Sequence, residues 1–221
     1  LIESDGGLTS SVIRRSAWAL SEGQEAVVAV LDTGVDAGHP DLAANIWRNE
    51  RERPDNGVDD DGNGFIDDVA GWDFVGVDAH PSDEHGHGTH VAGIIAAVTN
   101  NELGTAGIAP KARLMPLRVL SLGADGRLQA TTSDVKRAIA YAIHNGADVI
   151  HASVAELRRP LADPICASAP RECEPPNLHR ELELASQRGV VVVAPAGNLT
   201  GDSSTATWPR YPAALRSTVS S

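Results

Sequence analysis

Hydrophobic and polar positions along the chain follow two alternating patterns, one typical of buried strands and one typical of helices. Short unbroken apolar runs rich in valine predict strands buried on both faces, at residues 26–31 and 190–194. Residues 113–120 and 148–153 are predicted as two further strands. Pro116 lies inside residues 113–120, and because proline lacks a backbone donor, we expect it at a sheet edge or a bulge.

Three segments between these strands have a helical pattern. Residues 88–98 are small and apolar throughout, which predicts a helix packed on every side. A second helix is expected to begin with Ser133 as its cap and a third with Asn177, and a glycine follows each, at Gly146 and Gly189. Each of these two helices carries an apolar stripe, formed by Val135, Ile139, Ala142 and Ile143 in one and by Leu178, Leu182 and Ala185 in the other.

The order of these elements predicts an α/β fold. Strands and helices alternate from residue 26 to residue 194, which indicates a doubly wound, mostly parallel sheet with right-handed crossovers and helices on both faces. The 221 residues contain no internal repeat, linker or low-complexity tract, so we interpret residues 1–221 as a single domain. The longest apolar runs stop well short of the roughly 18 residues that a membrane helix needs.

Charge is unevenly distributed along the chain. There are 18 basic and 30 acidic residues, and the net charge of −12 disfavours nucleic acid or an anionic membrane as a partner. Ten of the acids lie within residues 55–84, where there is no lysine or arginine. Mutual repulsion would hold this segment open unless a cation bound. We therefore interpret residues 55–84 as an acidic, calcium-binding insertion within the domain.

One loop in the acidic segment has the spacing of a calcium site. Side-chain oxygens fall at loop positions 1, 3, 5 and 9, from Asp59, Asp61, Asn63 and Asp67, and Gly64 is at position 6, as in EF-hand-type loops. Position 12 is Ala70, so the bidentate acid of such loops is missing. We expect a variant geometry completed by Asp68, a carbonyl or water; the alternative is a merely solvated acidic loop.

Three polar residues have positions that suit chemistry, because the ligand crevice of a parallel sheet lies at the carboxyl ends of its strands. Asp32 ends the first strand, His87 opens the first helix and Asn198 follows the last strand. Such a set suits acyl transfer, in which the acid orients the imidazole, the imidazole moves a proton and the amide stabilises an oxyanion. A helix N-terminus also disfavours imidazolium, which helps His87 act as a base. Each residue alone has an ordinary structural interpretation, as a turn, cap or packing residue.

The segments around these residues occur in a distinctive order: AVLDTGVD at 29–36, HPDL at 39–42, HGTHVAG at 87–93, GIAP at 107–110 and AGN at 196–198. From about residue 17 to residue 215 the chain resembles the subtilisin-like serine endopeptidases, or subtilases. The resemblance implies that Asp32 is the orienting acid, His87 the general base and Asn198 the oxyanion donor. It also implies a second calcium site, formed by Asp41, Asn101 and carbonyls near residues 98, 103 and 105.

The same resemblance implies two segments that bind an extended peptide through its main chain. One is the edge segment 123–128, with Gly123, Gly126, Arg127 and Leu128; the other is the opposite wall, with Ser153, Val154 and Ala155. The family usually has Asn and then Ser-x-Gly-Gly in this wall, whereas this chain has His151 and then Ser153-Val154-Ala155-Glu156. Loss of both glycines puts side chains where a substrate backbone should approach closely.

The nucleophile of the family has no counterpart in the sequence. It lies in Gly-Thr-Ser-x-Ala, beyond the oxyanion donor, and no Gly-Thr-Ser occurs in this chain. We expect the chain to correspond to the N-terminal two-thirds of a peptidase domain, inactive alone, with its own missing C-terminal segment as a partner. The alternative is a non-catalytic, calcium-stabilised pseudoprotease or decoy that binds extended peptides. An aspartic protease would need Asp-Thr-Gly twice, and it occurs once.

The termini and cysteines bear on location. The chain begins at Leu1 without an initiator methionine or a signal sequence, so it looks like a processed or cropped segment. Cys166 and Cys173 are the only cysteines, and they could form a local disulfide or remain two free thiols. The pair hints at an oxidising compartment, and we expect a secreted or extracytoplasmic protein.

Overall fold

The computed structural model describes residues 17–124, 126–154, 156–157, 178–195 and 210–211. Their centre is a five-stranded sheet in which every pair of neighbouring strands is parallel, in the order β2-β3-β1-β6-β8. The strands are β1 (Val27–Asp32), β2 (Trp72–Asp73), β3 (Arg113–Arg118), β6 (Val149–Ala152) and β8 (Val191–Val193). The predicted α/β fold with a mostly parallel sheet is confirmed.

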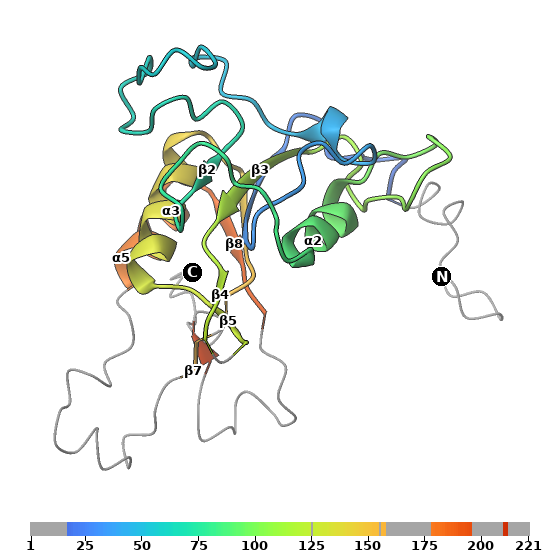
Figure 1. The fold of residues 1–221 in the computed structure, drawn as a ribbon. Coiled ribbons are helices and arrows are strands. Elements are labelled where there is room, and N and C mark those ends of the chain that lie inside the picture. Colours follow the sequence, from blue (N-terminus) through green and yellow to red (C-terminus); the bar gives the residue numbers. More distant parts are fainter. Residues whose placement is uncertain (1–16, 125, 155, 158–177, 196–209, 212–221) are drawn as a thin grey trace, which may run out of the picture.

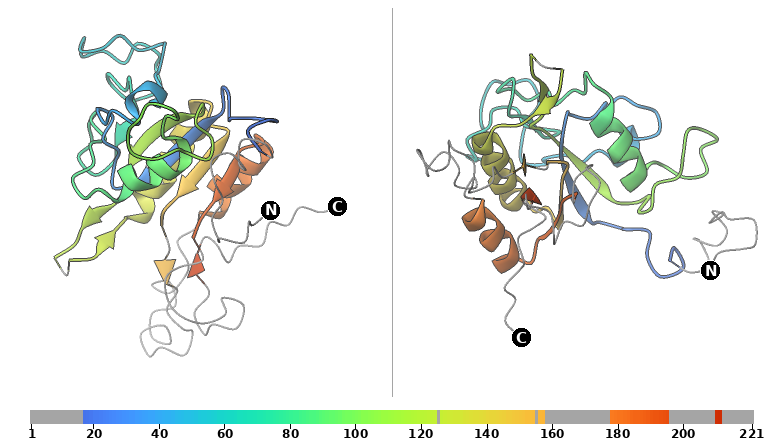
Figure 2. Two further views of the ribbon diagram at one scale, coloured as in Figure 1. Left: turned by 90° about the vertical axis from the view of Figure 1, so that its right-hand side faces the viewer. Right: turned by 90° about the horizontal axis from the view of Figure 1, so that it is seen from below.

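Helices cover both faces of the sheet. Helix α2 (His87–Ala96) lies on one face, and α3 (Thr132–His144) and α5 (His179–Gln187) lie together on the other (Figures 1 and 2). Strand β1 shows why residues 27–31, before the terminal Asp32, are apolar throughout. Ala29 and Leu31 are buried in the cluster under α3 and α5, whereas Val28 and Val30 are buried in the cluster under α2. Successive side chains of a strand point to opposite faces, so a strand covered on both sides has no polar positions.

The ends of α3 and α5 differ from the prediction by one or two residues. Helix α3 is capped by Thr131, whose Oγ1 accepts a hydrogen bond from the backbone N–H of Asp134 at 3.1 Å, so the predicted cap at Ser133 is wrong. Thr131 has the extended backbone that a cap requires, whereas Ser133 is already helical. The N-cap of α5 is Leu178, one residue after the predicted Asn177, which lies outside the described residues.

Pro116 is also placed differently from the prediction, because β3 has a neighbour on each side. The backbone N–H groups of Arg113 and Val119 donate toward β1, to Ala26 and Asp32. Alternation along the strand therefore turns the even-numbered positions away from β1. The missing donor of Pro116 faces the side of the short strand β2, so the β1–β3 ladder loses no hydrogen bond.

Two elements are less buried than their sequences predict. Ile94 on α2 is 49% exposed, so this helix is packed on one side and open on the other. In β8, Val191 and Val193 are 57% and 46% exposed, and Val192 packs against the core cluster under α3 and α5. Strand β8 is the last in the order of the described sheet, and only one of its faces is covered. An apolar composition therefore did not distinguish one buried face from two.

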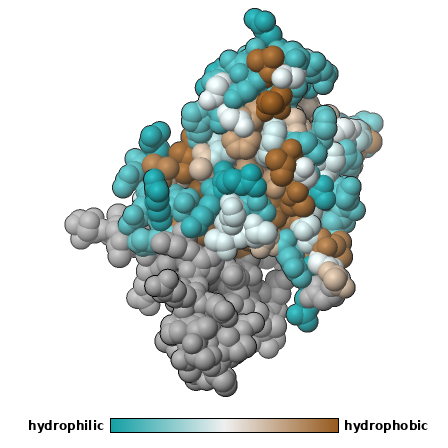
Figure 3. All heavy atoms as spheres, turned by 60° about the vertical axis from the view of Figure 1, so that its left-hand side comes forward, coloured by the Kyte–Doolittle hydropathy of each residue, from teal (hydrophilic) through white to brown (hydrophobic). Residues whose placement is uncertain are grey.

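Apart from the two-residue strand β2, the acidic segment is irregular; it lies between the short helix η1 (Ala43–Asn45) and α2, and its part before β2 extends beyond the sheet at the top of Figure 1. An aromatic residue ties it to the core: the ring of Phe65 packs edge-on against Trp72 and Tyr141, each with ring centroids 4.9 Å apart, and against Phe74 at 5.8 Å. Exposed apolar side chains on the face shown in Figure 3 lie in small groups among hydrophilic ones. Such scattered groups are normal for a protein surface.

Four short strands complete the described structure. Strands β4 (Ser121–Leu122) and β5 (Leu128–Gln129) form an antiparallel hairpin directly after β3. Strands β7 (Glu156–Leu157) and β9 (Arg210–Tyr211) form another antiparallel pair. Within the ranges that the structure describes, no helix reaches the length and apolar character that crossing a membrane requires.

Candidate active site and cation-binding loops

An acid and an imidazole meet where the carboxyl end of β1 faces the first turn of α2. Nδ1 of His87 lies 2.7 Å from Oδ1 of Asp32. Asp32 is fully buried, and the side chain of His87 is 44% exposed. A buried carboxylate at Nδ1 keeps the proton on that nitrogen and leaves Nε2 free to accept a proton. The structure thus brings together two of the three residues that the sequence analysis singled out for catalysis.

The close approach of α2 to β1 depends on a glycine. A Cβ on Gly88 would lie 2.1 Å from the carbonyl oxygen of Gly34 and 3.0 Å from Cβ of Asp32. Real Cβ atoms do not approach backbone oxygens so closely, so any larger residue would push the start of the helix away from the strand. The glycine after His87 therefore sets the spacing of the acid and the imidazole.

A second imidazole lies at the same edge of the sheet. His151 is paired with Val30 across the β1–β6 ladder, and alternation along both strands puts its side chain on the α2 face, as for Asp32. Burial lowers the pKa of His151; the negative charge of Asp32 opposes this effect, and a positive charge on His87 would add to it. The other carboxylate oxygen of Asp32, Oδ2, is buried and has no hydrogen-bond partner among the described residues.

The two predicted substrate-binding segments begin at this edge of the sheet. Of the segment 123–128, residues 123–124 and 126–127 lie between the strands of the β4–β5 hairpin and Leu128 begins β5; the N–H of Gly123 donates to the carbonyl of Arg127 at 2.8 Å. On the other side, the N–H of Ser153 donates to the carbonyl of Leu31 at 3.0 Å and so extends the ladder between β6 and β1. Asn198 and Ala155 lie outside the described residues, as do both cysteines.

At the start of the acidic segment, the carboxylates of Asp59 and Asp61 converge with that of Glu52, which precedes the segment. One oxygen of each lies within 4.8 Å of the others. Glu52 is 6% exposed: its Oε1 accepts hydrogen bonds from the N–H groups of Asp60 and Asp61, and its Oε2 is buried without a partner among the described residues. Burial raises the pKa of Glu52. Sequence reasoning missed this residue, because it precedes the acidic stretch and stands between Arg51 and Arg53, where counting charges does not point to it.

The other predicted ligands of this loop have different contacts. The side chain of Asn63 donates to Asp68 at 2.9 Å, and its backbone N–H donates to Asp59 and Asp61. The carboxylate of Asp67 accepts from the backbone N–H groups of Asn56 and Gly57 at 3.0 Å, so it stabilises a neighbouring turn and is not part of the convergent group.

Asp68, which was expected to complete the calcium site, instead joins the loop to α3. It is fully buried and accepts a 2.5 Å hydrogen bond from the hydroxyl of Tyr141, as well as hydrogen bonds from Asn49 and Asn63. Burial raises its pKa, and these three donors partly offset the rise. Asp68 is position 10 of the loop, which is not a ligand position in EF-hand-type loops, and its carboxylate makes a buried structural contact.

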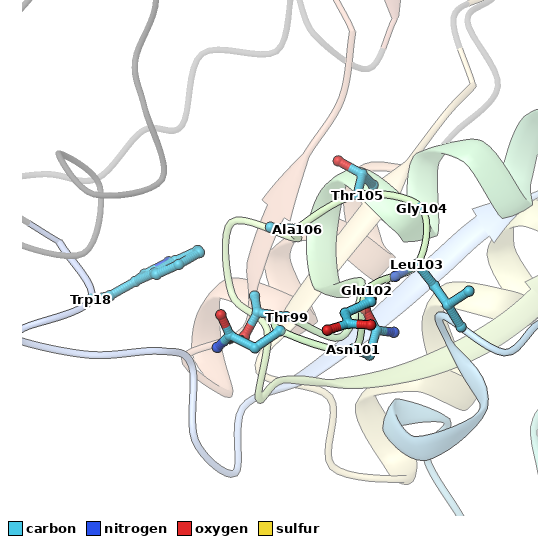
Figure 4. A pocket seen from close by; sticks show the side chains of 9 residues that line it. Trp18, Thr99, Asn101, Glu102, Leu103, Gly104, Thr105 and Ala106 are labelled. Atoms are coloured by element: carbon cyan, nitrogen blue, oxygen red, sulfur yellow. Dashed lines mark hydrogen bonds between the residues drawn. The ribbon is translucent and has the colours of Figure 1, made fainter.

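Asp41 and Asn101, implied as the second calcium site, do lie together. Asp41 is buried; its Oδ1 accepts from the side chain of Asn101 at 2.7 Å and its Oδ2 from the N–H of Thr105 at 3.0 Å. The loop 99–106 that surrounds this carboxylate also lines a pocket together with Trp18, as Figure 4 shows. A Cβ on Gly104 would lie 2.3 Å from Oδ2 of Asp41, so the loop can close on the carboxylate only at a glycine.

Asp83 is a further residue that sequence reasoning did not single out. Burial alone would raise its pKa, but hydrogen bonds from Thr89, Gly86 and Thr33 outweigh burial and lower the pKa to about 2. A recognisable signal was present in the sequence, because the residue lies four positions before His87 and just before a helix start, where carboxylates commonly cap.

Comparisons with known proteins agree with this geometry. The family model described as the subtilase family matches residues 23–220. The chain is 38% identical to thermitase from Thermoactinomyces vulgaris over 197 residues, which are 89% of this chain and 54% of thermitase. It is also 38% identical to a thermophilic serine proteinase from Bacillus sp. (strain AK1) over 185 residues, 84% of this chain and 35% of that protein.

Solved structures show the same likeness. Fervidolysin from Fervidobacterium pennivorans, a keratinolytic enzyme related to subtilisin, matches with a TM-score of 0.58 and 26% identity over 88% of this chain and 24% of its own. A lanthipeptide protease matches with a TM-score of 0.62 and 23% identity, over 94% of this chain and 50% of its own, and this likeness concerns the fold alone. The chain spans about half the length of thermitase and smaller shares of the Bacillus proteinase and fervidolysin.

Proposed function

This chain belongs to the subtilase family, and from that membership we propose that it supplies the acid and the base of a serine-type endopeptidase. The observation that carries the proposal is the 2.7 Å contact between Asp32 and His87 at the carboxyl edge of a parallel sheet. A buried acid that holds one nitrogen of a partly exposed imidazole is the arrangement that general-base activation of a hydroxyl requires.

In the proposed reaction, each of the site residues of this chain would have a separate role. His87 accepts a proton at Nε2 from the attacking hydroxyl and returns it to the leaving amine, while Asp32 holds Nδ1–H and stabilises the imidazolium. Asn198 donates to the oxyanion, a role that rests on the family resemblance. An extended polypeptide substrate binds through its main chain between the β4–β5 hairpin and the wall that begins at Ser153. No serine of this chain is assigned to the attack.

Labelling with a fluorophosphonate probe tests this proposal. The 221-residue chain alone is expected to give no labelling, and the chain supplied with a C-terminal segment that bears Gly-Thr-Ser is expected to label rapidly. In the supplemented form, His87→Ala should abolish labelling, because the serine loses its base. His144→Ala, an exposed histidine on α3, is the matched control and should label like the parent. Stoichiometric labelling of a serine in the 221-residue chain alone would contradict the assignment.

A pseudoprotease or decoy that binds extended peptides is the second candidate. The observation that favours it is the wall Ser153-Val154-Ala155-Glu156, which lacks the two glycines of the family pattern and so crowds the substrate backbone. In this case the supplemented chain would still bind an extended peptide, as measured by fluorescence anisotropy, and would not label. Labelling together with peptide turnover would exclude it.

We further propose that calcium stabilises the acidic segment. Glu52, Asp59 and Asp61 fit this ion, because hard oxygen donors converge and Oε2 of Glu52 is buried without a hydrogen-bond donor in the part of the chain that the structure describes. Arg51 pairs with Asp61 at 3.0 Å, and bound calcium would supply further positive charge to the three carboxylates. Asp41 and Asn101 would hold a second ion. Isothermal titration after chelation is expected to show calcium uptake together with a rise in melting temperature; no heat and no rise would contradict both sites.

A secreted or extracytoplasmic location is part of the same proposal. The two cysteines are seven positions apart, and a disulfide between them would suit an oxidising compartment. Non-reducing peptide mapping of protein secreted into an oxidising medium is expected to find Cys166 linked to Cys173. Recovery of two free thiols would argue against the location.

A further inference from the structure

One carboxylate near the Asp32–His87 pair collects an unusual number of donors. Oδ1 of Asp83 accepts from the hydroxyl of Thr33 at 2.8 Å and from the backbone N–H groups of His85 at 2.9 Å and Gly86 at 2.8 Å. Its Oδ2 accepts from both the N–H and the hydroxyl of Thr89, at 2.8 and 2.6 Å. The donors belong to the end of β1, to the loop before α2 and to the first turn of α2.

These donors are the sequence neighbours of the acid and the base. Thr33 follows Asp32 directly, and Thr89 is two residues beyond His87. The hydroxyl of Thr33 donates to Asp83 and accepts a 3.0 Å hydrogen bond from the N–H of Gly88. The strand end and the helix start are therefore joined twice, once through the carboxylate and once through this hydroxyl.

Helix α2 obtains its N-terminal cap from the same carboxylate. Gly86 occupies the cap position and has no side chain to accept from the first N–H groups of the helix. Asp83 accepts from Gly86 and Thr89 in its place, and a negative charge at this end of a helix is favourable. Thr33, directly after β1, also donates to the carboxylate of Asp83. One carboxylate therefore both caps the helix and holds it in line with Asp32.

We propose that Asp83 is a positioning residue of the acid–base pair, which sets the distance and direction of His87 relative to Asp32 without touching the substrate. This inference deepens the proposed function and rests on it. Asparagine has the shape of aspartate, but one of its two oxygens is replaced by an amide that donates. It therefore cannot accept from Thr33 and Gly86 on one side and from Thr89 on the other. Asp83→Asn is expected to release either the strand end or the helix start.

Proton NMR of the 221-residue chain measures the pair directly and needs no catalytic activity. The parent is expected to show a strongly downfield Nδ1–H resonance from His87, as a nitrogen bonded to a buried carboxylate does. In Asp83→Asn that resonance should disappear or shift upfield, and the imidazole pKa should move. Asp78→Asn is the matched control: this exposed acid belongs to the same acidic segment, its side chain accepts from the N–H of His80, and the resonance should persist.

Thr33 provides an independent test if Asp83→Asn does not fold. Thr33→Val removes the hydroxyl link with little change of shape and should weaken the resonance, whereas Thr33→Ser keeps the hydroxyl and should restore it. In the supplemented peptidase, Asp83→Asn should lower kcat by about tenfold or more with little change in KM. An unchanged resonance and imidazole pKa in a folded Asp83→Asn or Thr33→Val variant would overturn the inference. Normal resonances without labelling in any supplemented form would instead contradict the proposed peptidase function.

Discussion

Replacing Glu52 by glutamine should have opposite effects on stability with and without calcium. Oε2 of Glu52 is buried and has no hydrogen-bond donor within the described ranges, and oxygens of Asp59 and Asp61 lie within 4.8 Å of a carboxylate oxygen of Glu52. Burial, followed by the charges of Asp68 and Asp61, raises the pKa of Glu52, so its ionised form destabilises the cation-free protein. Glutamine removes the charge and keeps the acceptor for the N–H groups of Asp60 and Asp61. We expect Glu52→Gln to be more stable than the parent in a chelator.

The size of the effect follows from the spacing. Two unit charges 4.8 Å apart repel by about 3 kcal/mol at an effective dielectric constant of about 20, and backbone donors together with the ion pair between Arg51 and Asp61 offset part of this. A net gain of about 1–2 kcal/mol corresponds to a rise of roughly 2–8 °C in melting temperature for a chain of this size. Calcium at about a hundred times its Kd stabilises the parent by about 2.7 kcal/mol. The variant, which has lost a charged ligand, should gain less than half of that.

Melting curves followed by circular dichroism, in chelator and in excess calcium, measure both effects. Glu50→Gln is the matched control, because Glu50 is exposed and its substitution removes the same charge two positions away. The pH dependence has a definite sign: since the folded pKa of Glu52 is raised, the advantage of the variant in chelator is absent below the unfolded pKa of 4.5 and is complete once the pH has risen above the folded pKa. A lower melting temperature of Glu52→Gln in chelator, or a calcium response equal to that of the parent, would refute the reasoning.

Three further predictions concern the frame of the site. Gly88→Ala should cost about 1–3 kcal/mol or more in urea unfolding, because its Cβ would lie 2.1 Å from the Gly34 carbonyl; an unchanged midpoint would contradict this. Tyr141→Phe removes the donor to buried Asp68 and should cost about 1–3 kcal/mol. The pKa of Asp68 is already raised, so the cost should shrink as pH falls below it; a pH-independent cost would contradict this. Burial lowers the pKa of His151 below 6.5, so the parent should lose stability as pH falls from 6.5 toward the folded value. Melting curves of His151→Asn should show a flatter pH profile, and identical profiles would refute this prediction.

The fold was predictable because its signals are local. The apolar run of β1 and the stripe of α3 each follow from a few consecutive residues whose period matches one element. The helix cap was misassigned because Thr131 and Ser133 are both capping residues, and only the backbone path decides which hydroxyl reaches the N–H of Asp134. The exposed faces of α2 and β8 depend on what packs against each element, which their own residues do not encode.

The candidate site divides in the same way. Asp32 and His87 are 55 residues apart, yet a general rule about strand ends predicted that they would lie close together. Glu52 could not be found by that rule or by loop spacing, because it joins Asp59 and Asp61 only through the course of an irregular loop. Asp67 shows the converse, since it has the right spacing for a ligand and binds a neighbouring turn instead.

Because Phe65 packs against the core, the acidic segment cannot be removed or transferred to another protein as a self-contained surface loop. Its ring stands between Trp72, Phe74 and Tyr141, so the loop fills a place in the core of the domain. Trp72 and Phe74 belong to the same segment, so deleting it would remove three rings from beside Tyr141 of α3, and grafting it onto another scaffold would require a partner for those rings there. Anyone who shortens or transplants this segment would have to redesign the interior of the host as well as its surface.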